Sequence, residues 1–220
     1  MNLIRQRQKT ADCSLFLQIT LHFAPTLPGD NQYRDVVPLA HSIYHQPRVY
    51  LIVKDGETDL DNWKPHCESV LTLSEYRKAT KGALKRRKFI SNFDIILADA
   101  RIAQSMRTQY GKEVYRSKKV PYCVRLKSNV EESMDIIKRS TQLIFGSNRK
   151  CLEVKVGRMT MNNDLLLDNL KCLIESFDLH IPRGALNVKK LQLRSQSSKA
   201  YHLYSKCFQI RNRLIYSFVH

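Results

Sequence analysis

Two short apolar runs most constrain how this chain can fold. Val49–Val53 contains no charged residue, and Phe93–Ala98 contains only one. A strand that is apolar along its length is usually buried on both faces, as in a parallel sheet covered by helices. Sequence with helical character, at 74–89 and at about 99–110, accompanies these runs. The alternation of strands and helices between residues 48 and 125 predicts a small α/β unit with a parallel sheet.

The N-terminal segment has the pattern of a different kind of strand. Between Ser14 and Phe23, leucine and isoleucine alternate with other residues at every second position. This period of two is typical of a strand with one buried face and one accessible face. The composition of residues 24–31 predicts a turn, and a second short strand is expected near Val36–Leu39.

A helix is expected to open the C-terminal third of the chain. Asn129, followed three residues later by Glu132, has the spacing of a helix N-cap with a capping box. The expected helix ends at Gly146, which is well placed as a left-handed C-cap. Its expected apolar face consists of Met134, Ile137 and Ile144.

The remainder of this third predicts a strand, a helix and a last strand. Cys151–Val156 alternates like a half-buried strand, and Leu191 and Leu193 mark the last strand. Between them, a helix is expected to begin at Asn162 or Asn163. Its expected buried stripe consists of Leu166, Leu170, Leu173, Ile174 and Phe177.

The N-terminal strands have no helices of their own, whereas the C-terminal third is expected to contain two helices as well as two strands. We therefore predict one split α+β domain formed by residues 1–47 and 122–220. The α/β unit, residues 48–121, is expected as an insertion between the two parts. Pro47 and Pro121 lie near the expected crossings.

The chain is strongly basic, with 37 Lys and Arg against 20 Asp and Glu and a formal net charge of +17. This surplus favours a polyanionic partner, because each neutralised phosphate releases bound counterions. A basic surface without such a partner is the alternative. The basic clusters, at 5–9, 81–88, 116–119 and 183–213, are spread along the chain. This spacing suits an RNA footprint better than a single membrane-binding segment.

The sequence argues against metal, nucleotide and membrane chemistry. The six cysteines form no CxxC pair and no Cys/His set with zinc spacing, so we expect no metal. No glycine-rich phosphate loop follows Val53, where a dinucleotide-binding fold would need one. We therefore expect no enzymatic activity, cofactor or small-molecule substrate. The lack of a signal peptide and of a long apolar run predicts an intracellular protein without a membrane span.

Four motifs in order along the chain carry a resemblance to a known family. Pro38–His41 is similar to a Pro-Leu-Pro-His turn, with alanine at the third position. The central segment comprises Phe93–Ile102 and Gly111–Pro121, and Lys155–Met161 contains a Gly–Met loop. Together these motifs resemble those of the ribosomal protein L1 family, over about residues 12–204. The resemblance implies the architecture predicted above, with a Rossmann-like inserted domain.

The resemblance also implies a function, since members of this family bind rRNA through the split domain. The ribosomal member binds large-subunit rRNA in the mobile stalk, whereas nucleolar relatives of the Utp-thirty type bind precursor rRNA. Tyr110–Pro121 looks like the second branch, although the chain length is closer to the first. We expect a nucleolar ribosome-assembly factor whose partners are pre-rRNA and pre-ribosomal proteins. The alternative is a structural protein of the L1 stalk in cytoplasmic ribosomes, bound to rRNA and ribosomal proteins.

By this resemblance, RNA would bind the polar face of Ser14–Phe23 and the loop Gly157–Met161. In that loop the glycine would let RNA approach closely, the arginine and threonine would donate hydrogen bonds, and a methionine would pack on a sugar or base. A simple strand-to-helix turn is the alternative. The expected residues are Gln18, Thr20, His22, Gly157, Arg158, Thr160 and Met161.

Further candidates lie outside these two surfaces. Arg34 and His41 match family positions beside the RNA site, although a buried, hydrogen-bonded His41 is an equal alternative. A secondary basic patch on the inserted domain would grip RNA or an acidic partner nonspecifically, unless it is only a solvated face. It comprises Lys85, Arg86, Arg87, Lys88, Arg116, Lys118 and Lys119. The apolar tail at 205–220 is expected to be a partner-binding helix or part of the split domain.

Overall fold

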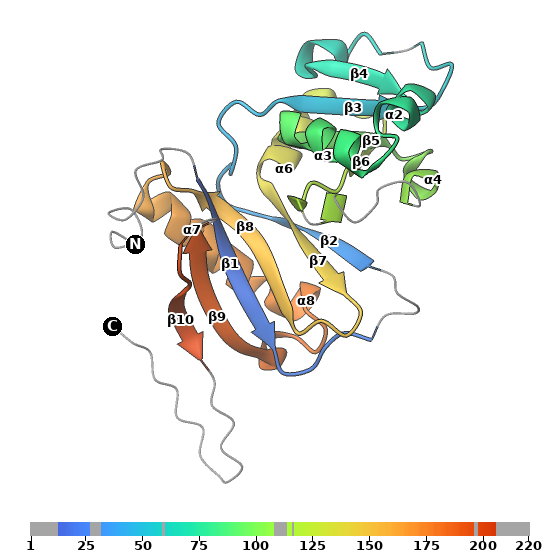
Figure 1. Ribbon diagram of the computed structural model, residues 1–220. Helices are drawn as coiled ribbons and strands as arrows, with labels where there is room; N and C mark the ends of the chain where they lie inside the picture. The colour runs from blue at the N-terminus through green and yellow to red at the C-terminus, as the bar shows by residue number, and fades with distance from the viewer. Residues whose placement is uncertain are drawn as a thin grey trace. The chain divides into compact units, whose positions relative to one another are not determined.

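The computed structural model describes residues 13–26, 32–58, 60–107, 114–115, 117–195 and 198–205. Its chain forms two units (Figure 1). The first unit combines the N-terminal segment up to Ile43 with the C-terminal segment from Lys138 onward. The second unit comprises Tyr44–Ile137.

The main sheet of the first unit has four strands in the order β10-β9-β1-β8. β1 (Ser14–Leu21) is an inner strand, antiparallel to both β8 (Cys151–Arg158) and β9 (Val188–Ser195). β10 (Tyr201–Ser205) pairs with β9 at the edge. The N-terminal strand β1 thus lies between two strands of the C-terminal segment, so neither chain end can form this sheet alone.

A two-stranded sheet and the helices complete the first unit. β2 (Gln32–Pro38) pairs antiparallel with β7 (Ser140–Gly146). The connection between β8 and β9 contains α7 (Asn163–Glu175), α8 (Phe177–His180) and the short 3-10 helix η2 (Ala185–Asn187). Figure 1 shows α7 behind the main sheet.

The core of the first unit lies on one face of the main sheet. Every second residue of β1, from Leu15 to Leu21, is buried, as the period of two predicts. α7 buries Leu166, Leu170 and Leu173, in accordance with the predicted stripe, whereas Ile174 is 42% exposed. The opposite face of the sheet therefore stays accessible to a ligand.

The second unit contains a four-stranded parallel sheet in the order β4-β3-β5-β6. The two apolar runs form its central strands, β3 (Val49–Val53) and β5 (Ile95–Asp99), and all their residues are buried. This confirms the fold class predicted for this part of the chain. The other elements are β4 (Ser69–Thr72), β6 (Tyr122–Val124), η1 (Lys64–His66), α2 (Leu73–Ala79), α3 (Ala83–Asn92), α4 (Ala103–Arg107) and α6 (Val130–Lys138).

The division between the units differs from the predicted boundaries. The observed boundaries lie after Ile43 and Ile137, whereas the boundaries predicted from the sequence lie after residues 47 and 121. The second boundary comes later because β6 pairs with β5 and so belongs to the parallel sheet. In addition, the indole Nε1 of Trp63 donates to the Leu126 carbonyl at 2.9 Å, which holds the following segment to the same unit.

The expected helix from Asn129 to Gly146 is wrong in its second half. The helix ends at Lys138, and Ser140–Gly146 is strand β7. Ile144 therefore does not extend the helix face that buries Met134 and Ile137. Its spacing of seven from Ile137 fits a helix only by coincidence, because the run after the helix pairs with β2 instead.

Two other predicted elements also differ from the structure. The helix expected at 74–89 is two helices, which Gly82 separates with a φ of +94° that L-residues rarely adopt. β9 is not the last strand, since β10 follows it. The tail beyond residue 205 lies outside the described residues, so its expected roles stay predictions.

Within the described part of the chain, no helix combines the length and apolar character that crossing a membrane requires. The same residues contain no group of three or more His, Cys, Asp or Glu side chains placed to hold a metal ion.

Candidate nucleic-acid interface

The accessible face of the main sheet carries two of the predicted residues. Gln18 and Thr20 alternate with the buried residues of β1 and are half-buried on its outer face. Gln18 lies opposite Glu153 on β8 and Gln192 on β9, and Thr20 lies opposite Lys190. The strand predicted to bind RNA is thus flanked on both sides by polar side chains from the C-terminal segment.

Several polar groups on this face are paired with one another. The Gln18 amide nitrogen donates to Cys151 Sγ at 3.1 Å. Glu153 forms an ion pair of 3.1 Å with Arg194, so the carboxylate of β8 on this face is neutralised locally. Lys155 and Lys190 also project from it. The pairing leaves a cationic surplus, which suits a polyanion.

The predicted loop Gly157–Met161 is partly strand, because Gly157 and Arg158 are the last residues of β8, and only Met159–Met161 follow it. Arg158 lies opposite Ser14, and the Met159 amide donates to the Cys13 carbonyl at 2.9 Å. Thr160 is exposed, whereas Met161 and Arg158 are half-buried. This segment therefore lies at one end of the main sheet, with Thr160 accessible to solvent.

Gly157 has a different structural role from the one predicted. It is buried, and a Cβ at this position would lie 2.7 Å from Leu166 Cδ1 on α7 and 3.2 Å from Met161 Sδ. The absent side chain thus makes room for the helix and the methionine. Close approach of RNA is not what requires glycine here, because the space is filled by the protein itself.

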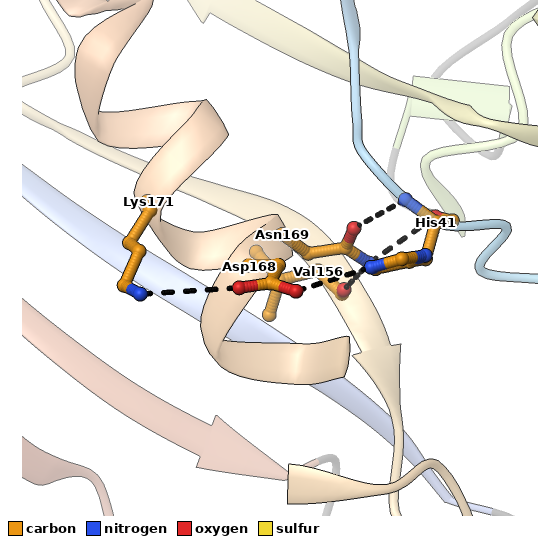
Figure 2. A network of polar contacts seen from close by, with 5 residues as sticks. All are labelled: His41, Val156, Asp168, Asn169 and Lys171. Atoms are coloured by element: carbon orange, nitrogen blue, oxygen red, sulfur yellow. Dashed lines mark hydrogen bonds and ion pairs between the residues drawn. The ribbon is translucent and has the colours of Figure 1, made fainter. Parts of the chain in front are cut away.

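His41 lies in a hydrogen-bonded network that joins the segment after β2 to α7 (Figure 2). Its backbone amide donates to Asn169 Oδ1 at 2.8 Å, and the Asn169 amide nitrogen donates to the carbonyls of His41 and Val156. The imidazole Nε2 lies 3.3 Å from Asp168 Oδ2 and its side chain is 36% exposed. His41 therefore forms hydrogen bonds within the protein, while part of its side chain stays accessible to solvent.

This network places His41 at the same end of β8 as the predicted loop. Val156, which accepts from Asn169, directly precedes Gly157. Asn169 is fully buried and was not predicted as a site residue. A signal existed in the sequence, because an asparagine falls among the leucines of a helix whose buried stripe was otherwise apolar.

Two predicted residues lie away from this end. Arg34 is on β2, opposite Ile144 in the two-stranded sheet, and is not on the main sheet. His22 lies just past β1, at the end far from Gly157–Met161, where its amide donates to the Asn187 carbonyl at 2.8 Å. Gln18, Thr20 and Arg158 thus share the outer face, and Thr160 is exposed beyond its edge, whereas Met161 packs beside Gly157 on the α7 side. Thr20 lies opposite Cys151, near the same far end as His22, and Arg34 is on the other sheet.

The secondary basic patch is smaller than predicted. Lys85, Arg87 and Lys88 are exposed on α3, while Arg86 is half-buried. Burial raises the pKa of the Tyr76 hydroxyl, and the positive charge of Arg86 partly opposes this shift. Lys118 is half-buried at a φ of 56°. Arg116 lies outside the residues that the structure describes.

Lys119 does not belong to an RNA-facing patch. Its ammonium donates to the carbonyls of Ile90, at 3.0 Å, and Phe93, near the C-terminal end of α3. Burial lowers the pKa of this ammonium, against the effect of the nearby Asp94. Cations commonly satisfy the free carbonyls at a helix end, so this lysine has a structural role.

Comparisons with known proteins place the chain in a family. It is 24% identical to "Ribosomal L1 domain-containing protein 1" of Mus musculus over 209 residues, which are 87% of this chain and 45% of the mouse protein. It is 25% identical to "Putative ribosome biogenesis protein C8F11.04" of Schizosaccharomyces pombe over 143 residues, covering 62% and 38%. It is 20% identical to "Large ribosomal subunit protein uL1" of Cenarchaeum symbiosum over 149 residues, covering 68% and 69%.

The chain spans less than half the length of the mouse and Schizosaccharomyces pombe relatives that it matches. The shared region is thus one part of those proteins. Residues 3–199 match the profile of the Ribosomal protein L1p/L10e family, which is most of the chain. The mixed α/β fold of the described residues agrees with this match. The chain therefore belongs to the Ribosomal protein L1p/L10e family.

Proposed function

We propose that this chain binds precursor rRNA in pre-ribosomal particles, as a ribosome-assembly factor of the nucleolus. The observation that carries the proposal is the accessible face of the main sheet, on which Lys155 and Lys190 flank β1 while Glu153 is paired with Arg194. The Gly157–Met161 loop lies at its edge. Phosphates would meet the lysines, and the exposed Thr160 hydroxyl would contact a ribose or base edge.

The names of the relatives support a role connected with the ribosome. One relative is named as a ribosome biogenesis protein, two are L1 domain-containing proteins, and one is a large-subunit protein. The proposal is of a binding protein without enzymatic activity. Its partners are pre-rRNA and the proteins of the precursor particle.

Cysteine protection tests whether RNA covers the proposed face. Cys151 is exposed on this face, opposite Thr20, whereas Cys123 is exposed on β6 of the second unit. Iodoacetamide labelling of the full chain, read by peptide mass spectrometry, gives both rates in one sample. Saturating rRNA should slow labelling of Cys151 several-fold and leave Cys123 reactive. Equal rates at Cys151 with and without RNA would remove the proposed face from the interface.

The alternative is a structural protein of the large-subunit L1 stalk, favoured by the archaeal ribosomal relative, of which the match covers 69%. Sedimentation of the tagged chain from growing cells separates the two functions. An assembly factor should migrate with precursor particles and crosslink to spacer-containing pre-rRNA. Migration with mature large subunits and polysomes would establish the alternative instead.

A further inference from the structure

A second surface lies at the end of β1 that is far from the Gly157–Met161 loop. Phe23, just beyond this strand, is 55% exposed. The guanidinium of Arg183 lies over its ring, with Cζ 4.5 Å from the ring centroid. Leu179 and Leu186, from the same connection as Arg183, are even more exposed. An exposed aromatic ring, two leucines and an arginine thus occur together where the proposed function assigns nothing.

Hydrogen bonds to one buried side chain fix the backbone of Phe23. Its amide donates to Asn187 Oδ1 at 2.8 Å, and the Asn187 amide nitrogen donates to the Phe23 carbonyl at 3.1 Å and to the Pro182 carbonyl at 2.9 Å. Asn187 is 3% exposed. Because the ring and the arginine's loop share this anchor, a ligand that stacked on them would require little additional ordering.

The chain segments beside this ring are mostly basic, although Asp35 of β2 forms an ion pair with His180 of the same connection. Lys150 lies beside Leu21, two residues before Phe23, since the Lys150 carbonyl accepts from the Leu21 amide at 2.7 Å, and Lys189 follows Val188, which pairs with Leu21. The segments 22–26, 147–150 and 178–190 contain one acidic residue, Asp178. Its carboxylate accepts from the Ala185 amide at 2.7 Å and is thus used within the loop. A negatively charged ligand would meet little repulsion here.

We propose that Phe23 and Arg183 form a stacking site for an unpaired base of single-stranded RNA, with Lys150 and Lys189 placed for its phosphates. The proposal rests on the proposed function, because it assumes an RNA partner, but it concerns a separate site. β1 spans Ser14–Leu21, so the two sites lie roughly 25 Å apart.

RNA fits this surface better than an acidic peptide does. A nucleobase has a flat apolar face that extends a stack of aromatic ring and guanidinium, whereas carboxylate side chains would use only the charges. Each nucleotide also brings a phosphate at the spacing of successive bases. The exposed ring would therefore contribute stacking to an RNA site, whereas it would contribute nothing to a site that binds carboxylates by charge alone.

The test measures binding of the full chain to a fluorescein-labelled dodecamer of uridine, by anisotropy. Phe23→Leu keeps an apolar residue but removes the stacking face, so affinity should fall roughly five- to a hundredfold, the range for loss of one stacked base. Phe23→Tyr keeps the ring and should bind within about twofold of the parent chain. Tyr33→Leu is the matched control, because Tyr33 is a half-exposed aromatic of the same unit on β2.

Unchanged binding by Phe23→Leu would overturn the proposal, as would an equal loss of affinity with Tyr33→Leu. Crosslinking of 5-iodouridine-substituted dodecamer to the unmutated chain gives an answer that does not depend on any variant's folding. Crosslinks should map to peptides containing Phe23 or Arg183, and crosslinks found only elsewhere would contradict the site. Protection of Cys151 by rRNA reports on the proposed rRNA interface without involving Phe23, so failure of that interface and failure of this site give different results.

Discussion

At the scale of single residues, Asn169 joins three parts of the first unit that are distant in sequence. Its side chain is fully buried, accepts from the backbone amide of His41, and donates to the backbone carbonyls of His41 and Val156. Sequence reasoning predicted His41 but not the residue that positions it. The reason is that a pattern of apolar spacing shows which face of α7 is buried, and does not show which backbone groups that face must satisfy.

Asn169→Ala should destabilise the first unit by about 2–4 kcal/mol, because it leaves buried backbone groups of His41 and Val156 unsatisfied. The matched control is Asn162→Ala, since Asn162 precedes the same helix but its side chain makes no capping bond. That change should cost less than about 0.5 kcal/mol. Urea unfolding followed by circular dichroism measures both. Similar losses in the two variants would contradict the role of the network.

Gly157→Ala should cost about 1–3 kcal/mol of stability even without RNA, because its Cβ would overlap Leu166. Gly146→Ala is the control, since a Cβ there meets the flexible side chain of Arg149, which can move aside. Its effect should stay within about 1 kcal/mol of zero. Thermal unfolding of both variants in RNA-free buffer is the measurement. A fully stable Gly157→Ala chain that binds RNA poorly would restore the original interpretation of this glycine.

At the scale of elements, the strands with a clear period were predictable and those without one were not. β1, β3 and β5 follow directly from alternation or from an unbroken apolar run. β7 was missed because Ser140–Gly146 is nearly all buried and follows a helix without a turn signal, so its residues fit either structure. β10 was missed because an edge strand exposes most of its side chains and leaves no buried row.

The basic patch on α3 shows the same limit for charges. Sequence position grouped Lys119 with Lys85, although the structure turns the first inward to the end of α3 and exposes the second. A list of basic residues contains no information on which of them satisfy carbonyls. The patch is therefore reduced to side chains whose exposure leaves them available to a phosphate.

Neutralising Lys85, Arg87 and Lys88 together by alanine should weaken binding to any RNA and reduce the slope of log affinity against log salt, provided that α3 contacts phosphates. Lys119→Met should instead lower the stability of the second unit and leave the salt slope unchanged. Filter binding to random-sequence RNA at several potassium chloride concentrations, with a melting curve for each variant, gives both quantities. A slope that falls only in Lys119→Met would reverse the assignment.

At the scale of the whole molecule, the division into a split unit and an inserted unit follows from which strands pair. β1 lies between β8 and β9, so the N-terminal segment is an inner part of a sheet made otherwise from the C-terminal segment. The general architecture could be predicted from the sequence, because strands and helices were unequally shared between the ends. The boundaries could not, since β6 is too short to reveal its partner.

A fragment of residues 44–137 should fold by itself, with the single tryptophan, Trp63, buried as in the full chain. Residues 138–220 alone should not, because they lack β1. Ile43 donates to the Lys138 carbonyl at 3.3 Å, so a short glycine–serine linker joining the two terminal segments should restore folding. Tryptophan emission and circular dichroism melts test these fragments. Cooperative melting of the isolated 138–220 fragment would refute the split unit.

The central claim is that the Gly157–Met161 loop, together with the outer face of the main sheet, recognises rRNA specifically. Its most direct test is the affinity of Thr160→Ala/Met161→Ala for the rRNA segment recovered by crosslinking and for a scrambled RNA of equal length. These substitutions remove a hydroxyl and a packing contact but no charge, so the salt slope should barely change at two potassium chloride concentrations. Binding to the rRNA segment should weaken by about 1–3 kcal/mol while binding to the scrambled RNA persists. Equal losses on both RNAs, or no loss on either, would contradict the claim.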